Sequence, residues 1–135
     1  MARALIPDAL EMRRLKYAAD IPLEAKDRVA DALRAAGRRS EALLLYDGRA
    51  DHPSLLTDVA WAVEEGASFT LSSLKRMGVP VTHEQLVACA ANAEAKGRWY
   101  DAYRCYERLA DEASLARVRE HLPNFKVAIP ENKKE

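Results

Sequence analysis

The chain has 135 residues, of which 49% are hydrophobic and 31% charged, a balance typical of one globular domain. Lys and Arg together number 21, as do Asp and Glu, so the formal net charge is zero. This neutrality argues against a general nucleic-acid binder, which usually carries a basic surplus.

Helices are predicted along the whole chain up to Pro123. Ala, Leu, Arg and Glu dominate the composition, and these side chains lose little rotamer freedom in a helix. Apolar residues recur at helical spacing between Pro and Gly breaks, and no segment shows convincing strand alternation. In chain order the predicted helices cover 7–20, 23–36, 40–50, 53–65, 69–77, 82–96, 98–111 and 112–122.

Capping signals mark several of the predicted boundaries. Gly37 and Gly97 each end a helix, as a glycine at the C-terminal position does. Ser40 is a candidate N-cap for the third helix. Thr82, with Gln85 three residues later, predicts a capping box at the start of the sixth.

One pattern occurs twice, in 29–51 and again in 89–111, at a constant offset of sixty residues. Eight of the 23 aligned positions are identical, which are Ala30/Ala90, Ala35/Ala95, Gly37/Gly97, Arg38/Arg98, Ala42/Ala102, Tyr46/Tyr106, Ala50/Ala110 and Asp51/Asp111. Gly66 lies almost midway between the two copies. We therefore predict a helical hairpin of about thirty residues, used three times, with a degenerate middle copy whose second helix is short.

The repeated positions resemble a tetratricopeptide repeat. That family places a small residue in its first helix, glycine or a small residue near the turn, alanine in its second helix, and an aromatic residue four positions later. The matching residues are Ala30, Gly37, Ala42 and Tyr46 in one copy and Ala90, Gly97, Ala102 and Tyr106 in the other, where Trp99 adds the aromatic often found after the turn.

The chain departs from this family pattern at several positions. The aromatic late in the first helix is replaced by Leu33 in one copy and Ala93 in the other. Ser114 stands where the family has its terminal proline. In the middle copy, Leu71 takes the place of the alanine and Lys75 that of the aromatic.

The resemblance covers roughly residues 23–114 and implies an all-α fold of about eight helices. Antiparallel α-hairpins would stack as a short right-handed array with capping helices. A single domain is expected over 1–122, with a mostly irregular tail at 123–135 in which Phe125, Val127 and Ile129 dock. The expected repeat units cover 23–51, 53–78 and 82–111, flanked by helices over 7–20 and 112–122.

The resemblance also implies a function, a non-catalytic protein–protein interaction module that acts as an adaptor or scaffold. In such arrays the first helix of each hairpin lines the binding face. The positions carried over to this chain are Glu24, Asp27, Asp31, Arg34, Glu64, Glu84 and Glu94. Six of these seven are acidic, so the implied partner is a basic or amphipathic protein segment or peptide.

An alternative function is a nucleic-acid-associated regulator that uses the helix pair at 69–95 as a helix-turn-helix. The glutamates in its second helix would repel phosphates, so we do not expect nucleic-acid binding. We also expect no catalysis, cofactor or metal, because the chain has no phosphate-binding glycine loop, no nucleophile elbow and no metal-ligand spacing around His52, His83 or His121.

Cys89 and Cys105 are expected to be free, partly buried thiols, since two cysteines in a helical chain do not make a disulfide framework. The sequence shows neither a signal peptide nor an apolar run long enough to span a membrane. We therefore expect a cytoplasmic protein that is not bound to membranes and is a monomer or a weak homodimer.

Overall fold

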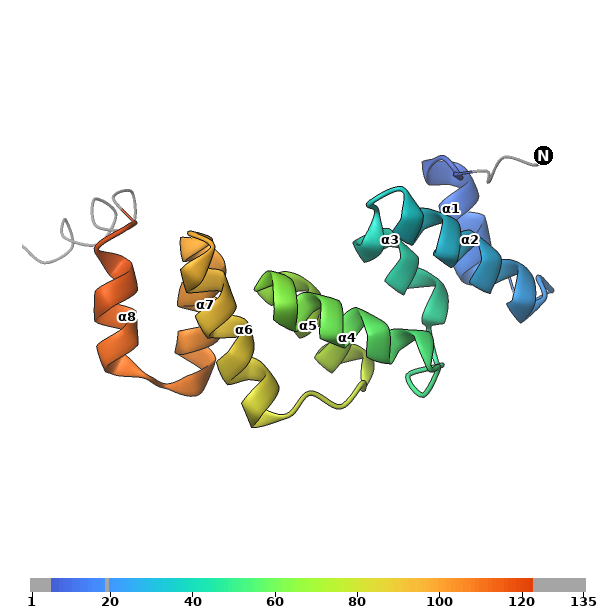
Figure 1. The fold of residues 1–135 in the computed structure, drawn as a ribbon. Helices are drawn as coiled ribbons and strands as arrows, with labels where there is room; N and C mark the ends of the chain where they lie inside the picture. The colour runs from blue at the N-terminus through green and yellow to red at the C-terminus, as the bar shows by residue number, and fades with distance from the viewer. Residues whose placement is uncertain (1–5, 19, 123–135) are drawn as a thin grey trace, which may run out of the picture. The chain divides into compact units, whose positions relative to one another are not determined.

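The computed structural model describes residues 6–18 and 20–122, and it confirms the all-α prediction (Figure 1). Eight α-helices and one 3₁₀ helix lie within these residues, with no strand among them. The elements are α1 (Ala9–Tyr17), α2 (Leu23–Ala35), α3 (Arg39–Leu43), η1 (Leu44–Tyr46), α4 (Ser54–Glu65), α5 (Ser68–Met77), α6 (His83–Ala95), α7 (Trp99–Leu109) and α8 (Glu112–Arg119). The predicted docking of Phe125, Val127 and Ile129 falls outside the described residues.

The chain divides into two compact units, residues 1–55 and 56–135. The first contains α1 to η1, and the second contains α5 to α8 together with nearly all of α4. The expectation of a single domain over 1–122 stays a prediction.

Some predicted helix boundaries are confirmed and others are wrong. Thr82 caps α6 in a capping box, with its hydroxyl accepting from the Gln85 amide at 3.1 Å and the Gln85 side chain accepting from the Thr82 amide at 2.8 Å. Ser40, however, is not the N-cap of α3, because the helix begins at Arg39 and Arg38 occupies the cap. The Arg38 guanidinium instead donates two hydrogen bonds to the Glu41 carboxylate, and the one from its Nη2 atom is 2.7 Å long. This ion pair stabilises the first turn of α3.

The same hairpin turn occurs at three glycines, Gly37, Gly66 and Gly97. Their φ angles are +77°, +72° and +74°, in the left-handed region that glycine adopts without strain. In each turn the residue after the glycine donates its amide to the carbonyl four residues before the glycine, at 2.8 Å in all three. The middle copy, which the sequence marks as degenerate, thus keeps the turn of the other two.

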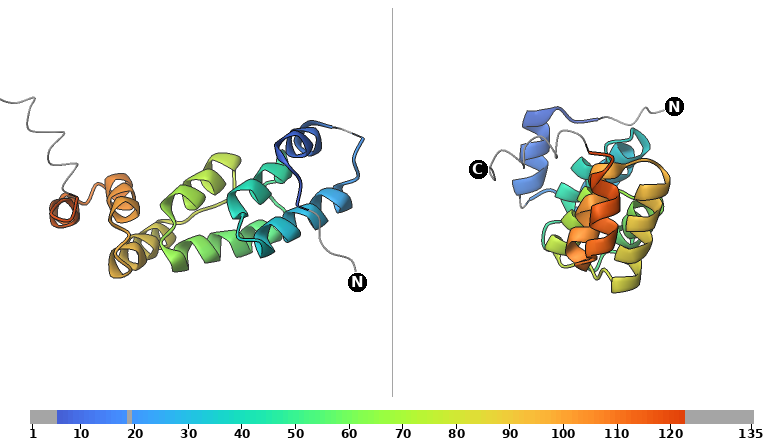
Figure 2. Two further views of the ribbon diagram at one scale, coloured as in Figure 1. Left: turned by 90° about the horizontal axis from the view of Figure 1, so that it is seen from above. Right: turned by 90° about the vertical axis from the view of Figure 1, so that its left-hand side faces the viewer.

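Packing inside the first and third hairpins follows the repeated residues. Ala30 and Ala42 between α2 and α3 have no exposed surface, and neither have Ala90 and Ala102 between α6 and α7. The small side chains let the two helices of a hairpin approach closely, and Figure 2 shows α6 and α7 side by side. These alanines therefore serve the helix contact that their spacing predicts.

The second helix of the first hairpin is shorter than the sequence predicts. The pattern predicts a helix over 40–50, but α3 has five residues followed by three of η1, whereas α5, with ten residues, agrees with the short helix predicted over 69–77. Gly48 explains the difference, because it adopts φ +75° and breaks the helix soon after Tyr46. Sixty residues later the corresponding position is Arg108, and α7 continues to Leu109.

The two cysteines face each other across the third hairpin. Cys89 on α6 and Cys105 on α7 are buried free thiols, and their sulfurs lie 3.6 Å apart. The hydrogen bond with Cys105, followed by burial, raises the pKa of Cys89, so this thiol stays protonated at neutral pH.

Labelling of the native protein with a thiol reagent is therefore expected to be slow, and denaturant should release two reactive thiols. Both effects follow from burial, because the reagent needs an accessible thiolate. Ellman's reagent with and without guanidinium chloride measures the two rates. Fewer than two thiols in denaturant, without a reductant, would mean that the pair is oxidised.

Candidate functional site

The seven residues predicted to form the binding face lie on the first helix of each hairpin, as their positions imply. Glu24, Asp27, Asp31 and Arg34 are on α2 in the first unit. The other three are in the second unit, namely Glu64 on α4 and Glu84 and Glu94 on α6.

Asp27 belongs to a polar cluster of the first unit. Its carboxylate accepts from Arg49 at 2.8 Å and lies 3.2 Å from Nε2 of His52. Partial burial raises the pKa of Asp27, but the hydrogen bonds and charges of Arg49 and His52 together outweigh burial and leave that pKa below its usual value. The Nδ1 atom of His52 accepts from the Ser54 amide at 3.1 Å, which helps to cap α4, in agreement with a capping role for this histidine.

Arg34, the one basic member of the predicted face, is also engaged within its own unit. It donates to Asp31 at 3.0 Å and to the hydroxyl of Tyr46 at 3.0 Å, and its guanidinium lies 5.2 Å from the Tyr46 ring centroid. The Arg49 guanidinium lies 4.8 Å from the same centroid. Two guanidinium groups thus lie close to the ring of Tyr46.

Glu94 in the third hairpin corresponds to Arg34 in the first. An acidic side chain therefore contacts the repeated tyrosine here, where the first hairpin has a basic one. The Glu94 carboxylate accepts from Tyr106 at 2.8 Å and from Arg117 of α8 at 2.7 and 2.9 Å. The Arg117 hydrogen bond lowers the pKa of Glu94, partial burial acts against it, and Tyr106 adds to the lowering. This pair ties α8 to the hairpin.

The acidic face is therefore half neutralised by internal arginines. Asp27, Asp31 and Glu94 each have an arginine partner, at 2.8, 3.0 and 2.7 Å. The other three acids, Glu24, Glu64 and Glu84, are exposed and have no ion pair within the described ranges. The structure shows three structural carboxylates and three available ones, in two units.

Acidification is expected to destabilise the fold through Asp27 and Glu94. Both pKa values lie below the unfolded value of about 4, so the folded state favours the ionised form. The stability that these groups contribute is fully present above about pH 5 and is lost as the pH falls through the lowered pKa values. Urea unfolding at a series of pH values between neutral and acidic measures this loss.

The control for this prediction is Glu94→Gln. This variant should be less stable at neutral pH and should lose less stability on acidification, because one titrating group is gone. An unchanged pH dependence in this variant would exclude the Glu94 carboxylate as a source of the acid sensitivity.

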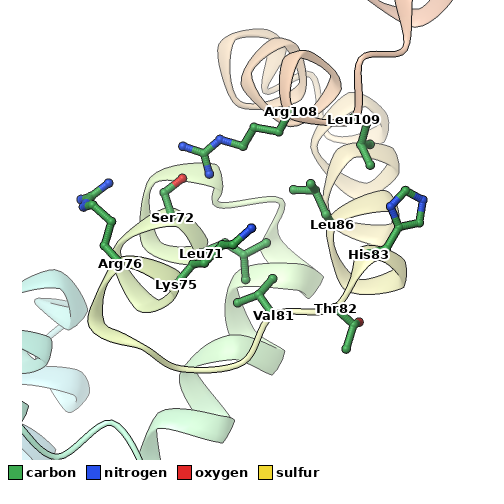
Figure 3. A pocket seen from close by; sticks show the side chains of 10 residues that line it. All are labelled: Leu71, Ser72, Lys75, Arg76, Val81, Thr82, His83, Leu86, Arg108 and Leu109. Carbon is green, nitrogen blue, oxygen red and sulfur yellow. The ribbon is translucent and has the colours of Figure 1, made fainter.

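A groove in the second unit was not anticipated from the sequence (Figure 3). It lies between α5, the connection to α6 with the first turn of that helix, and the end of α7, with a volume of about 900 Å³. Its lining consists of Leu71, Ser72, Lys75, Arg76, Val81, Thr82, His83, Leu86, Arg108 and Leu109. We call this the basic groove.

The lining of the basic groove is apolar and cationic and includes no carboxylate. Figure 3 shows Arg108 extending from α7 toward Ser72 and Arg76 of α5. A second cavity of about 330 Å³ shares Ser72, Arg76 and Arg108 with the groove and adds Phe69 among other side chains. The groove therefore continues along α5 and α7 into a neighbouring hollow.

The backbone that carries the groove is held by long-range contacts inside the second unit. Asp101 of α7 accepts from the amide and the hydroxyl of Ser68, at 3.1 and 2.6 Å, and so caps the start of α5. Asn92 of α6 donates to the carbonyl of Val63 at the end of α4, at 2.7 Å. The helices that line the groove thus have defined positions relative to one another.

Sequence reasoning missed the groove because its residues come from three separate segments. One signal for it was present, since Leu71 and Lys75 are the two positions where the middle copy replaces the repeated alanine and aromatic. These departures from the repeat coincide with the groove. Arg108 had no such mark, because its place beside α5 depends on tertiary packing.

Two further kinds of feature, metal-ligand clusters and membrane-spanning helices, are absent from the described residues. No group of three or more His, Cys, Asp or Glu side chains could hold a metal ion there, and none of the described helices has the length and apolarity needed to cross a bilayer. His121 stacks on Trp99, with ring centroids 3.8 Å apart.

Comparisons with protein-family models, with curated proteins and with solved structures found no match.

Proposed function

We propose that the chain is a non-catalytic protein–protein interaction module whose second unit binds a segment of a partner protein in the basic groove. The observation that carries this proposal is the groove itself, an open hollow that combines an apolar floor with charged and hydroxyl groups at its edges. Binding sites for other molecules are typically concave and largely apolar, with a few polar groups that orient the ligand.

The lining favours binding over chemistry. The Ser72 hydroxyl donates to the Ser68 carbonyl at 2.9 Å, so its proton is engaged within the helix. Catalysis by a hydroxyl needs a base placed to take that proton. An adaptor role therefore accounts for the groove better than an enzymatic one.

A tetratricopeptide-like array is part of the same proposal. Its support is the common turn at Gly37, Gly66 and Gly97 and the buried alanine pairs of the first and third hairpins. In such an array the first helices of the hairpins line the binding face, and the second helices lie away from it. The basic groove is lined mainly by two second helices, α5 and α7. The proposed site therefore differs from the acidic face that the resemblance implies.

The reduced, buried thiols support a cytoplasmic location, and we propose a monomer or weak homodimer there. The alternative function, a nucleic-acid regulator using 69–95, gains one observation, since Lys75 and Arg76 lie at the end of its first helix. Its second helix, α6, buries Cys89, Ala90 and Ala93 and exposes Glu84. We favour the protein partner because this acidic residue would face phosphates.

Selection from a random peptide library displayed on phage, with the full chain as bait, tests the proposal. Enriched peptides should shift the amide resonances of residues that line the groove, on α5, the α5–α6 connection and the end of α7. Shifts confined to the exposed faces of α2, α4 and α6 would favour the acidic face. The absence of any enriched peptide would contradict a peptide-binding groove.

A further inference from the structure

We propose that the basic groove selects an acidic, amphipathic partner segment, with carboxylates bound by Arg76 and Arg108 and apolar side chains placed on its aliphatic floor. This inference rests on the proposed function and specifies the chemistry of the partner. It also reverses the charge of the partner that the acidic first-helix residues imply.

The cations of the groove are not satisfied inside the protein. Lys75, Arg76 and Arg108 are exposed and make no ion pair with any described residue. Arg76 donates a long hydrogen bond, 3.3 Å, to the Ser73 hydroxyl. By contrast, Arg38, Arg49 and Arg117 each hold a carboxylate within 2.8 Å.

Helix ends account for only part of this charge. Lys75 and Arg76 lie in the last turn of α5, and Arg108 lies in the last turn of α7, where cations offset the partial negative charge of the helix. Each helix end carries roughly half an elementary charge. Two such ends cannot balance three cations, and the start of α6 at Thr82 adds partial positive charge on the same groove.

The neighbouring hollow adds a fourth cation and exposed aromatic surface. Arg104 lines it and has no ion pair in the described chain, while Phe69 and Tyr100 are 64% and 57% exposed. Its one carboxylate, Asp101, is bound to Ser68 and to Arg98 at 3.0 Å. A ligand that extends from the groove into this hollow would therefore meet two uncovered rings and further positive charge.

The aliphatic floor favours a protein segment over a nucleic acid. Leu71, Val81, Leu86 and Leu109 line the groove, and leucine or isoleucine side chains of a partner would bury against them. A nucleic acid has no comparable aliphatic groups. Arginine also suits carboxylates, because its planar guanidinium can bind both oxygens of one carboxylate.

The test runs the random-peptide selection in parallel on the full wild-type chain and on Arg76→Gln/Arg108→Gln. Wild-type chain should enrich peptides that combine Asp or Glu with Leu, Ile or Phe. Their affinity, measured by fluorescence anisotropy, should fall about tenfold or more in the double variant, because charge-assisted contacts are lost. Arg28→Gln/Lys96→Gln removes two exposed charges outside the groove and should leave the affinity unchanged.

The other outcomes overturn either the acidic partner alone or both proposals. Peptides that map to the groove but are basic or uncharged, or that bind both chains equally, overturn the acidic partner and leave the interaction module standing. Failure to enrich any groove-binding peptide overturns both. A labelled oligothymidylate that binds more tightly than the peptides, and is weakened by the same double variant, overturns both in favour of a nucleic acid. Circular dichroism of all variants verifies that each is folded.

Discussion

Replacing Gly66 with alanine is expected to lower the free energy of unfolding by about 2–5 kcal/mol. An added Cβ would lie 2.5 Å from the Cα and the amide nitrogen of Ala93 and 2.8 Å from its Cβ. Because two of these are backbone atoms of α6, relief requires the helix to move, and overpacking of this kind costs about 1–3 kcal/mol. The left-handed conformation at φ +72° adds about 1–2 kcal/mol for a residue with a side chain.

Gly97→Ala is the matched control for this prediction. Gly97 has nearly the same φ, +74°, lies in the same unit and makes the same turn, but an added Cβ would meet nothing closer than a Trp99 atom at 4.0 Å. The free energy of unfolding of the Gly97→Ala variant should therefore fall only by the cost of the left-handed conformation, about 1–2 kcal/mol. Urea denaturation followed by circular dichroism measures both, and equal losses would show that α6 does not press on the Gly66 turn.

Ala102→Leu is expected to cost about 1–3 kcal/mol by overpacking the third hairpin. Ala102 has no exposed surface, and it lies on the side of α7 that packs on α6, where Ala90 is equally buried. A leucine there must force the two helices apart or adopt a strained rotamer. Ala42→Leu should do the same in the first hairpin, where Ala42 is likewise fully buried.

Ala91→Leu provides the control for these overpacking variants. Ala91 is exposed on α6, so the same change of side chain adds apolar surface without a steric conflict. Its unfolding free energy should stay within about 0.5 kcal/mol of the wild-type value. If Ala102→Leu and Ala91→Leu behave alike, close packing of α6 on α7 is not what the repeated alanine provides.

Positions at which the sequence differs from the tetratricopeptide pattern that it resembles have structural roles in the second unit. The family's aromatic late in the first helix is replaced by Ala93, and this is the residue on which the Gly66 turn rests. A ring at that position would meet the turn. Leu71 and Lys75, the substituted positions of the middle hairpin, both line the basic groove, although Leu71 is also part of the buried core.

The sequence by itself determined the helices and their turns. Glycines at 37, 66 and 97 and the capping box of Thr82 act through neighbours within four residues, so local pattern was enough to place them. The prediction was wrong at Ser40 and in the length of the second helix of the first hairpin. In both places a local feature decides the structure, namely the Arg38–Glu41 contact and the left-handed Gly48.

Only the tertiary structure decided which charges are available. Asp27 and Glu94 look like members of one acidic face in sequence, but Arg49 and Arg117, 22 and 23 residues away, neutralise them. The basic groove likewise needs α5, the start of α6 and the end of α7 together. Ion pairing and groove formation depend on which helix faces pack against each other, and a helical repeat specifies the spacing of those faces without specifying the side chains that meet across them.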